Sequence, residues 1–287
     1  VNGGDEELCA AIVEHGCVEA LLPHLDNAAL REPEFACLSA LAKKSNEGAR
    51  RIVQGGALPF LCEYVSEQLA DGTGAVGQAV KLLAVLVEHG SSETILGAGA
   101  LRVIAQILDA LNQPRHLDEK GDEIDALCGL MSGLATRHQG ALTESMVSGS
   151  ARKLMGLVKR LTAEESRQPL SDVVGLLDLL ADDSVSARRL ADADAKDVLI
   201  ATMNAFPNDI PLAIQCARAL YKITGGAGGT LGPILARIRE LADAAADDDA
   251  MRSLVSTTKL AANLVLQPRI VSDRADADDV AKTARYV

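Results

Sequence analysis

Residues 52–65, IVQGGALPFLCEYV, read as the end of one helix, a glycine turn and the start of a second, amphipathic helix. The same phrase occurs earlier as IVEHGCVEALLPHL (12–25) and later as ILGAGALRVIAQIL (95–108). Weaker copies begin at Met146 and Leu190. A phrase that recurs every 40 to 50 residues or so is typical of a helical solenoid, in which each repeat packs on its neighbours. The spacing therefore predicts an all-α repeat protein.

Apolar residues within a copy follow the helical period. Val18, Leu21, Leu22 and Leu25 occupy positions i, i+3, i+4 and i+7, which form one buried helix face. A linker and a longer helix follow each copy. We predict an array over residues 1–268, with about six repeats that start near 12, 52, 95, 146, 190 and 230, and then a polar tail or capping helix at 269–287.

The composition limits the class of protein. Hydrophobic residues make up 48% of the chain but aromatic residues only 2%, and Trp is absent, so we expect a core of Leu, Val, Ile and Ala. No uninterrupted apolar run is long enough to cross a membrane, so we predict no membrane insertion. No signal peptide is visible, and a start at Val1 leads us to expect that the chain is part of a longer protein.

The net charge of −12 argues against nucleic acid as a partner, since an acidic surface repels phosphates. It is compatible with a basic partner, although mild acidity also keeps many proteins soluble.

The six cysteines show no paired CxxC spacing, which favours a reducing compartment. We expect the cytoplasm, with the nucleus or a cytoskeletal structure as alternatives. Cys37, Cys62, Cys128 and Cys216 lie among apolar residues of predicted helices, where a reduced cysteine acts as a small hydrophobe.

Cys9, His15 and Cys17 are close enough in sequence to suggest metal ligation, but no fourth ligand is evident. We therefore predict no metal site and no cofactor.

Residues 36–61, ACLSALAKKSNEGARRIVQGGALPFL, resemble armadillo repeats. A long helix ends near Asn-Glu, a short helix carries Ile-Val, and Gly-Ala-Leu-Pro starts the next repeat. The resemblance extends from residue 12 to about 266 and weakens in the fifth copy, where Asp192 and Asp194 replace the glycines. Two-helix HEAT repeats are the closest alternative. The resemblance implies a right-handed superhelical solenoid whose third helices line a concave groove.

In nuclear-import armadillo proteins, a Trp and an Asn four residues later on each third helix grip an extended peptide. Neither residue type occurs at the aligned positions of this chain. The predicted groove is instead lined by the following residues: Ala36, Ala40, Lys81, Val85, Gly129, Gly133, Arg218 and Lys222. A groove floored by Ala and Gly is wide and shallow, which favours a partner helix or a mixed-charge peptide.

Other candidate sites have simpler explanations. The glycine run at 225–229 lacks the Lys-Ser/Thr of a phosphate-binding loop and follows no strand. His15 and His89 each precede a glycine that ends a helix, where a histidine can contact the last carbonyl groups. Asp182 and Asp183 are expected to cap the next helix.

The sequence thus predicts a non-enzymatic scaffold that binds a partner helix or peptide in its concave groove and within a larger assembly, with a basic partner among the candidates. The alternative is a ligand-sensing or chaperone-type regulatory module of the same fold.

Overall fold

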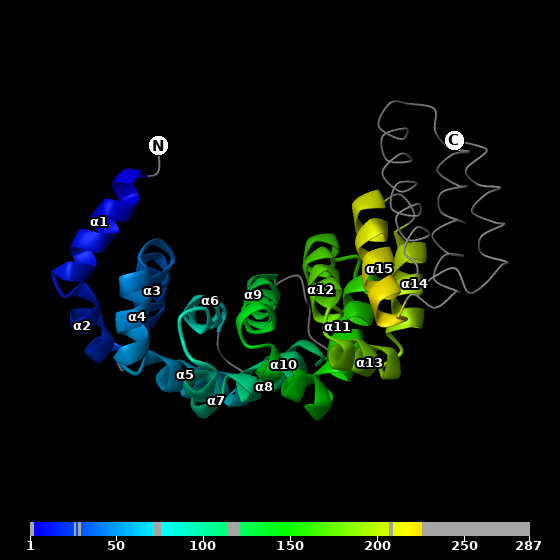
Figure 1. The fold of residues 1–287 in the computed structure, drawn as a ribbon, viewed down its shortest axis with the longest axis horizontal. Coiled ribbons are helices and arrows are strands. Elements are labelled where there is room, and N and C mark those ends of the chain that lie inside the picture. Colours follow the sequence, from blue (N-terminus) through cyan, green and yellow to red (C-terminus); the bar gives the residue numbers. More distant parts are fainter. Residues whose placement is uncertain are drawn as a thin grey trace. The chain divides into compact units, whose positions relative to one another are not determined.

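The computed structural model describes residues 3–225 apart from positions 26, 28–29, 72–75, 114–120 and 207–208 (Figure 1). The regular elements within these ranges are all helices, and the described part of the chain contains no strand. The predicted all-α repeat architecture is confirmed.

Five successive three-helix repeats make up the described ranges. The first contains α1 (Gly3–Glu14), α2 (Cys17–Leu21) with the 3₁₀ turn η1 (Leu22–His24), and α3 (Arg31–Lys44). The second contains α4 (Asn46–Gln54), α5 (Ala57–Asp71) and α6 (Gly77–Val87). The third contains α7 (Ser92–Ala98), α8 (Ala100–Leu111) and α9 (Gly121–Arg137). The fourth contains α10 (Gln139–Ser145) with the turn η3 (Met146–Ser150), α11 (Ala151–Ala163) and α12 (Arg167–Leu180). The fifth contains α13 (Ser184–Asp192), α14 (Ala195–Ala205) and α15 (Ile210–Ile223).

A residue with a positive φ angle separates the first helix of each repeat from the second. The residues are Gly16 (79°), Gly56 (82°), Gly99 (88°), Gly149 (110°) and Asp194 (62°). Glycine has no Cβ to clash in this conformation, and Asp is among the few other residues that tolerate it. The glycine of the repeated phrase therefore has a conformational role, and Asp194 fills the same role in the fifth repeat.

Side-chain caps start several of the helices. The Oγ of Ser45 accepts a hydrogen bond from the N–H of Gly48 (3.0 Å), and that of Ser91 accepts one from Thr94 (3.1 Å). The carboxylate of Asp183 accepts one from the N–H of Ser186 (2.8 Å), which confirms the predicted capping role of this residue.

Aliphatic side chains fill the core, as the composition predicts. On α6, for example, Leu82, Leu83 and Leu86 are fully buried. Cys62, Cys128 and Cys216 are also buried, and burial raises the pKa of each of these thiols to about 12.

The prediction that Cys37 acts as a small hydrophobe among apolar residues is wrong, because its side chain is exposed. Its neighbours Phe35 and Leu38 lie on the side of α3 that is buried in the hydrophobic core, and position 37 lies outside this buried side.

The chain divides into two compact units, Val1–Leu176 and Leu177–Val287. The site described below lies within the first unit. The predicted repeat near residue 230, the acidic run at 247–249, the tail at 269–287 and most of the glycine run at 225–229 lie outside the described residues.

Candidate functional site

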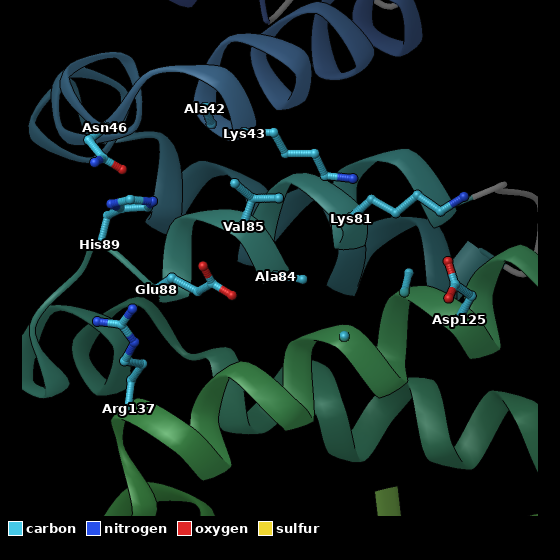
Figure 2. Close-up of a pocket in the computed structure, with 12 residues that line it drawn as sticks. Ala42, Lys43, Asn46, Lys81, Ala84, Val85, Glu88, His89, Asp125 and Arg137 are labelled. Atoms are coloured by element: carbon cyan, nitrogen blue, oxygen red, sulfur yellow. The ribbon is translucent and has the colours of Figure 1, made fainter. Parts of the chain in front are cut away.

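A cavity of about 580 Å³ in the first unit is lined by residues of the third helices α3, α6 and α9 and of the segments that follow α3 and α6 (Figure 2). Helix α6 packs against both α3 and α9 (Figure 1). The lining residues are Ala42, Lys43, Asn46, Lys81, Ala84, Val85, Glu88, His89, Asp125, Ala126, Gly129 and Arg137.

One face of α6 supplies the middle of the cavity. Lys81, Ala84, Val85, Glu88 and His89 are spaced i, i+3, i+4, i+7 and i+8, so they share a single side of the helix and its C-terminal extension. The opposite side of α6 carries the leucines that are buried in the core. The amphipathic pattern of this helix thus determines which side chains face the cavity.

The floor between α6 and α9 is built from small residues. A Cβ atom at Gly129 would lie 3.7 Å from the Cβ of Ala84, and one at Gly133 would lie 3.6 Å from the carbonyl oxygen of Ala84. Because both distances are ordinary contact distances, the two helix backbones already approach closely at this point. The C-terminal end of α6 also contacts the residue that precedes α10, since Nε2 of His138 lies 3.1 Å from the carbonyl oxygen of Val87.

A sharp corner between α3 and α4 places Lys43 and Asn46 in the lining. Ser45 is the only residue between the two helices, and its extended backbone ends α3 while its hydroxyl caps α4. Asn46 consequently lies in the first turn of α4, and it is drawn beside His89 in Figure 2.

Charged side chains of both signs surround the apolar floor. The Nζ of Lys81 lies 3.1 Å from Oδ1 of Asp122 and forms an ion pair between α6 and α9. Lys43, Glu88, Asp125 and Arg137 form no ion pair with any other residue of the described ranges. All four are exposed. The cavity therefore presents two cations and two anions that have no ion-pair partner among the residues that the structure describes.

Three of the predicted groove residues, Lys81, Val85 and Gly129, come together in this cavity. Ala36 and Ala40 are exposed on α3 but do not line it, and Gly133 is buried.

The remaining two predicted groove residues, Arg218 and Lys222, lie on α15 in the second unit and form ion pairs there. An Arg218 guanidinium nitrogen lies 3.0 Å from Oδ2 of Asp178, and the Nζ of Lys222 lies 2.9 Å from Oδ1 of the same residue. The Lys222 Nζ also lies 2.8 Å from Oδ1 of Asp182. These cations thus have acidic partners on and just beyond α12.

Sequence reasoning missed most of the charged lining. Ala84, Glu88 and His89 lie three, seven and eight residues after Lys81, so extending the helical period from that residue would have found them. Lys43, Asn46 and Arg137 carry no such signal, because their contribution depends on how helix ends from different repeats pack.

Other types of site are not formed within the described ranges. No group of three His, Cys, Asp or Glu side chains in them is arranged to hold a metal ion, and none of their helices could span a membrane. His15 confirms the predicted contact with a helix end, since its Nδ1 lies 2.7 Å from the carbonyl oxygen of Ala11.

Comparisons with known proteins identify the fold. No protein-family model matches the chain, and no curated protein matches it. Among solved structures, an engineered protein from the Northeast Structural Genomics Consortium has a TM-score of 0.63 at 17% identity, covering 98% of this chain and 71% of that protein. A structure described as computationally designed armadillo repeat proteins for modular peptide recognition has a TM-score of 0.61 at 16% identity, with coverage of 84% and 98%. A designed armadillo repeat protein in complex with the peptide (KR)4 has a TM-score of 0.55 at 15% identity, with coverage of 93% and 98%. The chain has the fold of an armadillo repeat solenoid.

Proposed function

We propose that this protein is a non-enzymatic scaffold that binds a segment of a partner protein in the cavity lined by α3, α6 and α9. The observation that carries the proposal is the combination of an apolar floor of small residues with charged side chains that have no partner in the described ranges. Small floor residues allow a partner backbone to approach closely, and polar groups around them can fix its position.

The comparisons support the same type of function. One of the similar designed proteins is described as made for modular peptide recognition, and another is in complex with a peptide. We extend this use of the fold to the present chain, and we place the scaffold in a larger cytoplasmic assembly, consistent with its six free cysteines.

A displayed library of random peptides, selected on the immobilised protein, tests the proposal. Val85 is half-buried in the middle of the lining, so Val85→Arg should fill the cavity with a long charged side chain. We expect the selected peptides to bind the variant at least about tenfold more weakly, in line with the loss of a central contact. Binding is measured by fluorescence polarisation with labelled synthetic copies of the peptides.

The matched control is Leu96→Arg, the same type of change at an exposed aliphatic residue on α7 that does not line the cavity. It should leave peptide affinity unchanged. If the selection yields no binders, or only peptides that bind both variants as tightly as the original protein, the cavity is not the binding site and the proposal is wrong.

A further inference from the structure

We infer that the segment bound in this cavity carries both acidic and basic side chains. The inference rests on the proposed function and concerns the chemistry of the partner. It follows from the signs, positions and pairing of the charged residues that line the cavity.

Charges of both signs are distributed around the lining. In Figure 2, Glu88 and Arg137 lie toward the end where His89 is found, whereas Lys81 and Asp125 lie toward the opposite end. Lys43 projects from the α3 side. One end of the cavity thus presents Glu88 and Arg137, and the other presents Asp125 beside Lys81.

Only one of these charged side chains, Lys81, forms an ion pair with another described residue of the protein. Lys81 is matched by Asp122 at 3.1 Å, which leaves Lys43 and Arg137 as cations and Glu88 and Asp125 as anions without a partner in the described ranges. A ligand of one sign would meet repulsion from two of these four side chains. A segment with both signs can match all of them, which gives the complementarity that favours one register.

Helix geometry sets the spacing of the matching charges. Asp125 and Arg137 are separated by about 18 Å along α9, at a rise of about 1.5 Å per residue. An extended chain advances about 3.3 Å per residue and alternates its side chains between two faces. In an extended segment, a base and an acid about six residues apart would therefore lie on one face at a separation that matches Asp125 and Arg137.

The overall charge of the protein allows the test to distinguish a preference for mixed charge from a general attraction of basic peptides. A chain with a net charge of −12 attracts basic peptides at long range, so a uniformly basic peptide is the obvious competitor. Long-range attraction is screened by salt, whereas close pairing in the cavity is screened less. The preference for mixed charge should therefore become clearer as the salt concentration rises toward the physiological value.

The test uses synthetic variants of a peptide whose binding is weakened by Val85→Arg. Its charged positions are made alternately acidic and basic, all lysine, all glutamate or all glutamine, and each dissociation constant is measured by fluorescence polarisation at physiological salt. We expect the mixed peptide to bind at least about threefold more tightly than each of the others, as exposed ion pairs of this kind contribute modestly.

Charge-reversal variants assign the preference to named residues. Lys43→Glu should weaken the mixed peptide by about two- to fivefold. Its control is Lys44→Glu, which changes the same charge on the next residue of α3 but does not line the cavity. The double variant Asp125→Lys with Arg137→Glu should prefer the peptide in which only the base and the acid that match these two residues are exchanged. Glu93→Lys on α7 is the control for Asp125→Lys, and it should leave the order of affinities unchanged.

The outcomes separate this inference from the proposed function. If the all-lysine or all-glutamate peptide binds as tightly as the mixed one while Val85→Arg still weakens binding, the cavity binds peptides but the inference about charge is wrong. If Lys43→Glu has no more effect than Lys44→Glu, and the double variant shows no exchange of preference, the inference is wrong as well. A lack of any binding that depends on Val85 overturns the proposed function itself.

Discussion

Residues with positive φ angles mark the points where the chain of this protein changes direction. Most of them are glycines, but Glu165 adopts a φ of 54° in the connection between α11 and α12. The N–H of Ser166 donates to the carbonyl oxygen of Leu161 at 3.1 Å, so residue 165 occupies the left-handed position that ends a helix in a Schellman motif. Glycine is the residue usually found there.

Glu165→Gly should therefore stabilise the protein by about 1 kcal/mol. The substitution relieves the strain on Cβ, and it also removes a negative charge from the C-terminal end of α11, where the helix dipole disfavours one. Thermal unfolding followed by circular dichroism should show a higher melting temperature.

The neighbouring change Glu164→Gly is the matched control. Glu164 has a right-handed conformation and forms an ion pair with Arg160 at 3.1 Å, so its loss should lower the melting temperature. If the two substitutions shift the melting temperature in the same direction, the effect does not come from the backbone conformation of residue 165.

At the scale of the helical element, the ion pairs of Asp178 link α12 to α15. The side chain of Asp178 is only 14% exposed, and that of Lys222 is 26% exposed. Burial alone would lower the pKa of Lys222, but hydrogen bonds with Asp182 and Asp178 outweigh it, so the pKa is raised above its ordinary value of 10.5. Folding therefore favours the charged form of this lysine.

Lys222→Met should lower the free energy of unfolding at neutral pH by about 1 to 2 kcal/mol, as expected for a partly buried ion pair. Because the folded pKa lies above 10.5, the contribution of Lys222 is fully present below that pH and is lost as the pH rises beyond it. The difference between the variant and the original protein should thus shrink at strongly alkaline pH.

Arg218→Met provides the comparison, because Arg218 also pairs with Asp178 but its side chain is 53% exposed. Its effect should be about 0.5 kcal/mol or less. Urea unfolding over a series of pH values measures all three proteins. Equal effects from the two substitutions, or a Lys222→Met difference that is constant with pH, would contradict this account.

At the scale of the whole molecule, contacts between repeats are local. Helix α6 packs against α3, α4, α5 and α9, whereas α11 packs against α8 and η3. In such an array stability is approximately a sum of repeat and neighbour terms, so a local loss of packing should remain local.

Leu83→Ala removes a fully buried side chain from α6 and should cost about 2 to 5 kcal/mol locally. Hydrogen exchange followed by mass spectrometry should show faster amide exchange in α6, α3 and α9, with much smaller changes in α11. A uniform increase across α3 to α11 would mean instead that these repeats unfold as one cooperative unit.

The amino-acid sequence by itself determined the repeat architecture, the helices and the turns between them. These features depend on contacts between residues a few positions apart: the helical spacing of leucines, the glycine at each left-handed turn, and capping residues such as Asp183. Local signals of this kind can be read without knowing how distant segments meet.

The tertiary structure alone decided which side chains form the cavity. Lys43 comes from the first repeat, whereas Asp125 and Arg137 come from the third, and Lys81 pairs with Asp122 from 41 positions away in the chain. A helical period assigns residues to a face, and it already places Cys37 outside the stripe of Phe35 and Leu38, but it does not show that Gly133 is covered by its neighbours. The reason is physical: exposure and pairing depend on the packing of α3, α6 and α9 against one another, which no single helix determines.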